Sequence, residues 1–554
     1  MGMDTSKLRE LPIGIETFEE IINDDYVYVD KTDLVWHLAH RRKVMFFGRP
    51  RRFGKSLLLS TLAAYFRGER ELFRGLKLER LQAESGKEWV EYPVLHLKVA
   101  AGDGKSGSDF VAMTRLELDR LDDQYGVDTS AFEHGARLGS LITELAKKFG
   151  RKVVILVDEY DAPLIDTLGI EHLREEHEDC RRQLRSLYQN FKWYDQYIHY
   201  VLLTGVAQFS GLSLFSGLNN IERISLEEEF SGICGITQEE LERDLSGHID
   251  RVAEVRGESR AEVLDQLRRM YDGYKFTPEG ERVYNPFGLL SALKSGRFLN
   301  HWMRTGTSQV LDSLLPKFRL DLVKLEGGVM ADVDDLDQLE GRDGSSAPFL
   351  FQTGYLTIVD TIGRRRVVLA FPNGEVKNAL AKLMQTKILG YDSEGVFATL
   401  RRLKDALNGG DVAGFMGIME PILAGVAAGN DPKESLIRES HFRNTLFVVF
   451  KLLEEEVAIE IPSALGRSDC EVEARDAIYI FELKLRSEGK GNLTPLDALR
   501  QIRGRRYGAR HRDEGKPMVC VGAVFDNEGG CEWEAMGYDE VMKLGGDDCY
   551  PVGG

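Results

Sequence analysis

Basic residues are scarce relative to acidic ones in this chain of 554 residues, which has 72 Lys and Arg against 90 Asp and Glu and a formal net charge of -18. A protein that coats nucleic acid with its whole surface needs a broad excess of Lys and Arg. The composition therefore excludes that class, and any contact with nucleic acid must be local.

Cysteine is also scarce, and long apolar runs are absent. The six cysteines include no CxxC pair and no His partner at the spacing of a zinc site, so we expect reduced residues that mostly serve packing. No run reaches the roughly 18 to 20 apolar residues of a membrane span. The N-terminus MGMDTSKLRELPIG lacks the apolar core of a signal peptide. We therefore expect a cytoplasmic protein.

The length exceeds what a single hydrophobic core supports, so we expect several domains. Strand-like and helix-like segments alternate over residues 1–235, which predicts an α/β core with a largely parallel sheet. Residues 236–325 are mostly helical and predict a lid subdomain. Residues 326–435 predict a connector, whose acidic, Gly/Ser-rich part 326–348 is the best candidate for a flexible stretch. Residues 436–554 predict a second α/β domain.

The segment VMFFGRPRRFGKSLLLSTL predicts a strand that runs into a phosphate-binding loop and then a helix. In a P-loop, backbone amides wrap the phosphates, Lys bridges the outer ones and a hydroxyl holds magnesium. Gly54, Lys55 and Ser56 are the candidates for these parts in binding ATP. Five residues separate Gly48 from Gly54, where the usual pattern has four. An ordinary helix start is the alternative, and Lys55 is expected to be exposed without a ligand.

Two later strands end in polar residues that suit the same site. The strand VVILVDEYD ends in Asp158, a candidate for the Mg²⁺ shell, and in Glu159, a candidate for polarising the attacking water. The strand YVLLTGVAQFS ends in Thr204 and Gln208, where many ring-type ATPases place a residue that senses the γ-phosphate. A strand closed by acidic turn residues and a simple Thr cap are the alternatives.

These phrases resemble a known family, the AAA-ATPase-like proteins of bacteria and some anaerobic eukaryotes. Its usual architecture is an N-terminal P-loop ATPase followed by a nuclease-like domain of the PD-(D/E)xK superfamily. The resemblance covers about residues 8–310, and the family's own loop reads RPRRFGKS, so the displaced Gly48 follows family usage. It implies an AAA-like core with a helical lid, a restriction-endonuclease-like second domain, and ATP with Mg²⁺ as cofactors. The further phrases that carry it are LPIGIETFEEIINDDYVYVDKT, LVDEYDAPL, LTGVAQFSGLSLFSGLNNIERISL, MYDGYKF and VYNPFGLL.

A second constellation lies near the C-terminus. In the strand YIFELKL, Glu482 and Lys484 point to one face. Asp469 lies 13 residues before Glu482, and a hairpin would place the two carboxylates on adjacent strands, about 4.8 Å apart. Such a pair predicts a site for Mg²⁺ or Mn²⁺, with Lys484 orienting or deprotonating a water that attacks a phosphodiester. A solvent-facing Glu-Lys pair on an edge strand is the alternative.

The sequence TPLDALRQIRGRRYGARHR follows these strands and predicts a helix capped by Thr494 and Asp497. Gln501 lies one turn before Arg505, and six arginines fall between positions 500 and 512. A basic helix beside a carboxylate site suits the phosphate backbone of DNA or RNA, and a solvated charged face is the alternative.

This region also resembles the family's second domain, which carries a GRxD motif, a strand with ExK and a helix with a Gln-Ile pair. The matching positions here are Gly466 to Asp469, Glu482 to Lys484, and Gln501 with Ile502. Glu460 matches an acidic position that the family often has before the first motif. The resemblance implies catalytic roles for Asp469, Glu482, Lys484 and Gln501, with the two acids as metal ligands.

The leading hypothesis is an ATPase whose nucleotide state regulates a metal-dependent nuclease acting on DNA or RNA, in the setting of phage defence or mobile elements. The alternative is a signalling ATPase switch whose C-terminal domain binds nucleic acid or a protein partner without cutting. A purely structural scaffold would leave both phosphate-type sites unexplained. The sequence leaves assembly into a homo-oligomer open.

Overall fold

The computed structural model divides the chain into two compact units. Unit 1 comprises Met1–Arg319 and Gly328–Val376, and unit 2 comprises Leu320–Gly327 and Lys377–Gly554. The residues that the structure describes are 8–41, 43–99, 102, 105–208, 221–302, 322–338, 345–363, 365–380, 393–428, 439–453, 456–463, 466–486, 493–526 and 530–545.

Unit 1 is built on a parallel sheet with the strand order β2-β3-β4-β1-β5. Its central strands are continuous apolar runs whose residues are buried on both faces, as expected for a parallel sheet covered by helices. The carboxyl ends of parallel strands meet at one edge, which is where polar residues gather. The strands are β1 (Val44–Gly48), β2 (Val94–Lys98), β3 (Val153–Asp158), β4 (Ile198–Gly205) and β5 (Glu222–Arg223).

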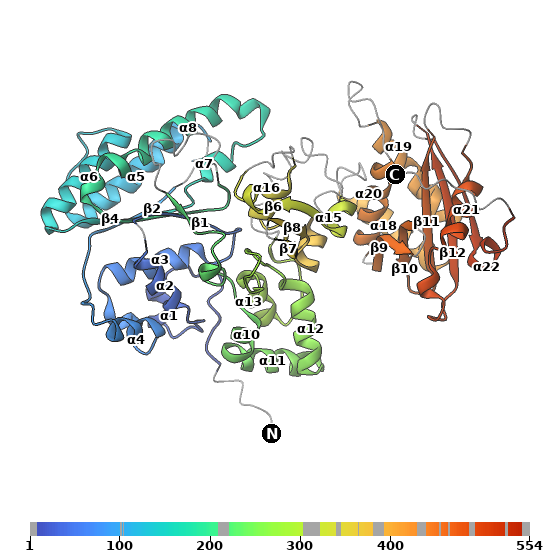
Figure 1. The fold of residues 1–554 in the computed structure, drawn as a ribbon, viewed down its shortest axis with the longest axis horizontal. Helices are drawn as coiled ribbons and strands as arrows, with labels where there is room; N and C mark the ends of the chain where they lie inside the picture. Colours follow the sequence, from blue (N-terminus) through green and yellow to red (C-terminus); the bar gives the residue numbers. More distant parts are fainter. Residues whose placement is uncertain are drawn as a thin grey trace. The chain divides into compact units, whose positions relative to one another are not determined.

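Helices cover both faces of this sheet (Figure 1). On one face lie α5 (Gly107–Tyr125), α6 (His134–Phe149) and α8 (Arg174–Tyr188), and on the other lie α1 (Phe18–Asn23), α2 (Thr32–Ala39), α3 (Lys55–Phe66) and α4 (Lys77–Glu84). Helix α5 begins where Ser106 and Asp109 form a capping box, and it ends at Gly126 in the left-handed conformation.

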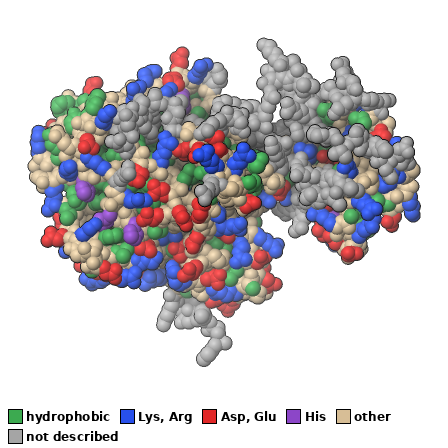
Figure 2. Space-filling model, viewed as in Figure 1, with side chains coloured by type: hydrophobic (Ala, Val, Ile, Leu, Met, Phe, Trp, Pro, Cys, Tyr) green, Lys and Arg blue, Asp and Glu red, His purple; other side chains and the backbone are tan. Residues whose placement is uncertain are grey.

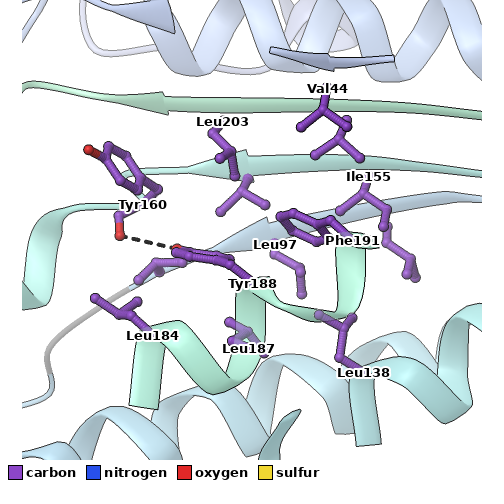
Figure 3. Packing of buried hydrophobic residues seen from close by; sticks show 14 of the residues in the cluster. Val44, Leu97, Leu138, Ile155, Tyr160, Leu184, Leu187, Tyr188, Phe191 and Leu203 are labelled. Carbon is purple, nitrogen blue, oxygen red and sulfur yellow. Dashed lines mark hydrogen bonds between the residues drawn. The ribbon is translucent and has the colours of Figure 1, made fainter. Parts of the chain in front are cut away.

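The core between the sheet and the α5, α6 and α8 layer is made of aliphatic side chains and a few aromatic rings (Figure 3). Val44, Ile155 and Leu203 point from the sheet towards rings that the helices supply. The buried Tyr188 hydroxyl donates a 3.1 Å hydrogen bond to the carbonyl of Tyr160, just beyond β3. This bond fixes the turn that follows β3 against helix α8.

A bundle of short helices follows the sheet, and it confirms the helical lid predicted for this fold class. Side chains of Thr237, Ser259 and Asn285 cap three of its helices, so their starts are locally encoded. The lid has its own apolar core, which includes Leu241, Leu267 and Leu289. Its helices are α10 (Gln238–Asp244), α11 (Ser246–Arg256), α12 (Arg260–Tyr271) and α13 (Pro286–Ser295).

A small antiparallel sheet with the order β6-β8-β7 completes unit 1, together with the short helix α16 (Ala347–Gln352). Its strands are β6 (Val329–Asp332), β7 (Thr357–Ile362) and β8 (Arg366–Ala370). The expectation of a flexible stretch over 326–348 is therefore wrong for its first part. Val329 to Asp332 pair with β8, and this pairing provides hydrogen-bond partners for their backbone N–H and C=O groups. The acidic, Gly-rich composition had instead predicted a flexible backbone.

Unit 2 holds a mixed sheet with the order β13-β12-β11-β10-β9, in which only the pair β11 and β12 is parallel among the described strands. Helices α15 and α20 pack on this sheet, as does α21. The strands are β9 (Glu456–Ser463), β10 (Gly466–Glu473), β11 (Ile478–Leu485), β12 (Met518–Phe525) and β13 (Cys531–Gly537). The helices are α15 (Leu322–Gly327), α18 (Ser393–Asn408), α19 (Val412–Ala428), α20 (Glu439–Leu452), α21 (Pro495–Arg505) and α22 (Tyr538–Val541).

The predicted fold class is confirmed, since a parallel AAA-like sheet precedes a C-terminal mixed sheet. The four domain bounds remain a prediction. None of the described helices is both long enough and apolar enough to cross a membrane. Acidic and basic side chains are mixed over the visible face, and neither sign forms a continuous field in the described part (Figure 2).

Candidate functional sites

The loop between β1 and α3 has the geometry of a phosphate cradle. Gly54 has φ +92°, a left-handed conformation that L side chains rarely adopt, and it is the N-cap of the 12-residue helix α3. The backbone amides at such a helix start favour an anion. Gly48 belongs to the sheet, because it pairs with Gly205 and donates its N–H to Ser225 Oγ at 2.8 Å. The loop proper therefore begins at Arg49, which accounts for the displaced glycine.

Lys55 lies inside this loop, and the expectation that it is exposed without a ligand is wrong. The residue is 7% exposed, and its Nζ donates to the carbonyls of Arg49 at 3.0 Å and Pro50 at 3.1 Å. Burial lowers the pKa of Lys55, while the nearby Asp158 and Asp161 carboxylates oppose that shift. The ammonium group is held by loop carbonyls at the point where outer phosphates would compete for it.

Arg49 anchors the start of the loop, and sequence reasoning missed it. Its NH1 group donates 2.8 Å hydrogen bonds to the carbonyls of Gly48 and Ser225. The guanidinium also lies over the rings of Phe47 and Phe276, with its carbon 4.4 and 4.2 Å from their centroids. Burial lowers its pKa to about 10. The preceding Gly48 and the RPRR run were the signals that pointed to this position.

The ends of β3 and β4 are joined by polar side chains. Asp158 Oδ1 accepts hydrogen bonds from the Thr204 hydroxyl at 2.8 Å and from the Glu159 N–H at 3.1 Å. Asp158 and Thr204 are buried, whereas Glu159 is half-buried with φ +53°. The left-handed turn at Glu159 sends its side chain away from the strand and into the wall of a cavity.

Asp161 is a further buried carboxylate that sequence reasoning did not assign. Its Oδ2 accepts hydrogen bonds from the N–H groups of Val206 at 2.9 Å and Ala207 at 2.7 Å. Burial raises its pKa to about 6, although these backbone bonds and Lys55 act in the opposite direction. Asp161 therefore ties the turn after β3 to the loop after β4, where Gln208 lies.

A cavity of about 370 Å³ opens beside the loop, within the size range of small-molecule sites. Lys55, Ser56 and Glu159 line it, whereas Asp158 and Thr204 are buried and are not among the described residues that line it. Sequence reasoning missed the other charged lining residues, although the RPRR run contains two of them. These are Glu16, Arg51, Arg52 and Lys98.

The residues present fit a magnesium nucleotide. The Ser56 hydroxyl at the first turn of α3 and the Asp158 carboxylate at the end of β3 are the oxygen donors that Mg²⁺ prefers, and Mg²⁺ retains several waters. Lys55 and the amides of the loop supply the positive field that phosphates require. The predicted nucleotide-site residues therefore converge on one edge of the sheet.

In unit 2 the hairpin of β10 and β11 places the predicted carboxylates side by side. The strands are antiparallel, with Cys470 opposite Phe481. Asp469 is 7% exposed, and its Oδ2 accepts a 2.8 Å hydrogen bond from the N–H of Leu483, the residue after Glu482. The Asp469 carboxylate thus lies against the ExK strand.

Glu482 is the centre of this second site. The residue is 1% exposed, and its Oε1 accepts a 2.6 Å hydrogen bond from Lys484 Nζ and another from Gln501 Nε2 on α21. A solvent-facing Glu-Lys pair is therefore excluded, because α21 covers this face of β11. Asp469, Glu482, Lys484 and Gln501 lie together.

Two further residues belong to the site and were missed. Arg443 on α20 lies with NH1 3.6 Å from Asp469 Oδ1. The buried Tyr507 hydroxyl accepts a 3.5 Å hydrogen bond from Gln501, and its pKa is raised by burial and by the Glu482 carboxylate. Arg443 comes from a helix distant in the chain, whereas Tyr507 lies six residues after Gln501, in the basic segment itself, and neither position belongs to a short motif.

The donor set suits a hard cation. Asp469 and Glu482 supply carboxylate oxygens from adjacent strands, and the described residues contain no group of three or more His, Cys, Asp or Glu able to hold a metal. Mg²⁺ accepts such a sparse set because it keeps its own waters. Glu460 falls on β9 between the residues paired with Ser468 and Cys470, and its side chain lies outside the described residues.

The predicted cap of the basic helix is confirmed, since Thr494 and Asp497 form a capping box. The helix ends at Arg505, and four of the six arginines between positions 500 and 512 fall into two groups. Arg503 donates to the carbonyl of Leu544, and Arg510 pairs with the buried Glu471 at 3.0 Å, so both have structural contacts. Arg506 and Arg512 are exposed and better placed to meet a polyanion.

Comparisons with known proteins match the two parts of the chain that carry these sites. Residues 12–215 match the family model described as "Predicted AAA-ATPase", and residues 437–532 match the one described as "PD-(D/E)XK nuclease superfamily". A protein of Azotobacter chroococcum mcd 1, described as "Uncharacterized protein in vnfD 5'region", is 35% identical over 529 residues, which cover 94% of this chain and 97% of the relative.

Proposed function

Because the chain belongs to the family of AAA-ATPase-like proteins with a C-terminal PD-(D/E)XK nuclease superfamily domain, we propose that it couples ATP hydrolysis to metal-dependent cleavage of nucleic acid. In this proposal unit 1 binds and hydrolyses ATP, and unit 2 cuts DNA or RNA. The nucleotide state of unit 1 regulates the cutting. A cytoplasmic location and a place in phage defence or mobile-element biology belong to the same proposal.

The nucleotide cavity carries the ATPase half of the proposal. Lys55 and the loop amides bind the outer phosphates, and Ser56 with Asp158 holds the magnesium ion, which neutralises charge on the phosphates. Glu159 orients the attacking water, whose oxygen bonds to the γ-phosphorus as the bond to the leaving ADP oxygen breaks. Thr204 and Asp161 keep the ends of β3 and β4 in register for this arrangement.

The position of Glu482 carries the nuclease half. The buried Glu482 carboxylate contacts Lys484 and Gln501 and lies beside the Asp469 carboxylate. This arrangement is able to hold a divalent cation and a water molecule together. Bound there, Mg²⁺ or Mn²⁺ supplies Lewis acidity to the scissile phosphodiester. Lys484 orients the water or accepts its proton, and the new P–O bond forms as one ester P–O bond breaks.

Purified protein incubated with end-labelled DNA and RNA, single-stranded and duplex, tests the whole proposal. The reactions contain or lack ATP, and contain Mg²⁺, Mn²⁺ or a chelator. We expect metal-dependent cleavage whose rate changes with ATP, and we expect Lys55→Ala to remove the response to ATP. Cleavage without any metal, or no cleavage with any polymer, would contradict the nuclease half and favour the switch that binds without cutting.

A further inference from the structure

The segment Gly328–Val376, here called the coupling segment, belongs to unit 1 but is joined to unit 2 at both ends. Residues Leu320–Gly327 precede it and Lys377 follows it, and both belong to unit 2. The chain therefore crosses between the units twice on the two sides of this segment. A displacement of the coupling segment therefore acts on unit 2 at both ends, through the peptide bonds 327–328 and 376–377.

The coupling segment holds the loop that follows β4. Gln352, the last residue of α16, accepts a 2.7 Å hydrogen bond at Oε1 from the N–H of Gln208. Its Nε2 donates to the carbonyls of Leu336 and Gln338, at 2.9 and 2.5 Å. One amide side chain therefore joins the loop after β4 to two parts of the coupling segment. Asp161 also holds this loop, because its carboxylate accepts hydrogen bonds from the N–H groups of Val206 and Ala207.

The coupling segment also braces the phosphate loop. A Cβ added to Gly354 would lie 2.7 Å from Pro50 Cβ, so the two backbones approach closely. Trp302, fully buried, donates from Nε1 to the Arg51 carbonyl at 3.3 Å, and its ring meets Tyr355 edge-on at 5.1 Å. The Trp302 N–H donates in turn to Glu375 Oε1 at 2.6 Å, and Glu375 lies two residues before Lys377, where the chain enters unit 2.

On the side of unit 2, the two crossings are tied to each other and to the carboxylate site. Glu326 and Lys377 form a 2.9 Å ion pair, which joins the chain just before the coupling segment to the chain just after it. Helix α15, which carries Glu326, packs on α20 and β9. Helix α20 carries Arg443, which faces Asp469 at 3.6 Å.

We propose that the coupling segment transmits the state of the nucleotide cavity to the carboxylate site through Gln352 and the Trp302–Gly354 brace. The inference rests on the proposed function. Lys55 Nζ binds the carbonyls of Arg49 and Pro50, and outer phosphates compete for that ammonium group. Release of the Pro50 carbonyl changes the loop where it meets Gly354 and Trp302. A ligand shifts an equilibrium between two conformations only if it binds one of them more tightly than the other. The two conformations here are the phosphate loop with the Pro50 carbonyl bound to Lys55 and the loop with that carbonyl released.

Hydrogen–deuterium exchange of the full chain, with and without ATP and Mg²⁺, tests this path without relying on cleavage. We expect ATP to change exchange in the phosphate loop, in the coupling segment and in α15 with α20. Gln352→Ala should retain the change in the phosphate loop and lose it in α15 and α20. Gln124→Ala, which alters an exposed glutamine on α5, is the matched control and should respond as the parent does.

A second variant separates the bond to Gln208 from general damage to α16. Gln352→Glu keeps an acceptor for the Gln208 N–H but places a carboxylate against the carbonyls of Leu336 and Gln338, so it should also lose the distant response. In cleavage assays, the ratio of rates with and without ATP should fall to unity in both Gln352 variants. If ATP changes exchange in the phosphate loop while the coupling segment and α15 stay unchanged, the inference is wrong and the ATPase proposal stands. If ATP leaves the phosphate loop itself unchanged, the proposed function is wrong.

Discussion

The Thr204 hydroxyl donates a 2.8 Å hydrogen bond to Asp158 Oδ1, which joins the ends of β4 and β3 side chain to side chain. Thr204 is fully buried and is not among the described residues that line the nucleotide cavity. Because this bond uses the one proton of the hydroxyl, we expect Thr204 to orient Asp158 instead of donating to phosphate, which differs from the sensing role that the sequence pattern indicates.

Thr204→Val tests this role, because valine keeps the shape of the side chain and removes only the hydroxyl. Loss of a hydrogen bond to a charged group costs about 1–3 kcal/mol, so ATP turnover should fall about 5- to 150-fold. The variant should need more Mg²⁺ to reach half its maximal rate, since the Asp158 carboxylate is no longer held. A Mg²⁺ dependence identical to that of the parent would contradict the positioning role.

Lys55→Ala should lower ATP hydrolysis by about 100-fold or more, because it removes the ammonium group that stabilises charge on the outer phosphates. Steady-state phosphate release measures the effect. Lys77→Ala, which breaks a half-buried pair with Asp33 away from the cavity, is the control and should keep the parent rate. Since Lys55 is buried, thermal unfolding of the variant must be measured alongside to show that the loss is chemical.

Glu159→Gln should bind ATP and hydrolyse it about 100- to 10,000-fold more slowly, the range expected when a general base is lost. The amide keeps the size of the side chain but no longer polarises water. Asp158→Ala should instead weaken binding of the magnesium nucleotide. Equilibrium binding of a fluorescent ATP analogue separates the two variants, and parent-like turnover in Glu159→Gln would assign the base to another group.

Asp469→Asn and Glu482→Gln should each abolish cleavage while nucleic-acid binding persists, because the carboxylates hold the cation and the arginines supply affinity. Arg506→Ala combined with Arg512→Ala should do the reverse, and should flatten the dependence of binding on salt. Lys484→Ala should retain the metal and lose turnover. Filter binding at several salt concentrations and gel-based cleavage provide the two measurements.

Glu375 gives a pH dependence with a definite sign. Its side chain is fully buried, and burial raises its pKa to about 7. In the unfolded chain a Glu has a pKa of about 4.3. The folded protein therefore binds this proton more tightly than the unfolded chain does. The stabilisation that the proton gives is complete below about pH 4.3 and is lost as the pH rises through about 7.

Glu375→Gln removes this ionisation. Relative to the parent, the variant should gain stability as the pH rises between these values, by up to about 3 kcal/mol. Urea unfolding of both proteins at a series of pH values measures the difference. A difference between them that does not change with pH would show that Glu375 is not protonated in the folded protein.

Local sequence signals carried much of the prediction. The apolar strand, the loop and the helix around Gly54 are contiguous, so hydrophobic patterning and one glycine were enough to find them. The alternation in YIFELKL likewise placed Glu482 and Lys484 on one face. Contacts between distant parts of the chain leave no such pattern. Arg49 meets Ser225 and Phe276, and Arg443 meets Asp469, through packing that no local periodicity encodes.

The same limit applies to the residues that hold the sites in place. Asp161 belongs to the quoted segment VVILVDEYD, but its role is to accept hydrogen bonds from the loop after β4, which begins 45 residues later in the chain. Residues 326–435 showed no reactive constellation and were expected to be a structural connector. Two features that composition does not report carry their contribution: the close approach of Gly354 to Pro50 and the amide side chain of Gln352.

The contact of Gly354 with Pro50 has a consequence for folding during synthesis, because Gly354 is synthesised long after the phosphate loop. A ribosome that has released residues 1–319 has supplied every strand of the parallel sheet but not Gln352, Gly354 or Glu375. The nascent ATPase therefore emerges without the contact of Gly354 against Pro50, and it is completed only after the first crossing into unit 2 has been synthesised. A chain interrupted at that crossing should bind nucleotide weakly even though all its P-loop residues are present.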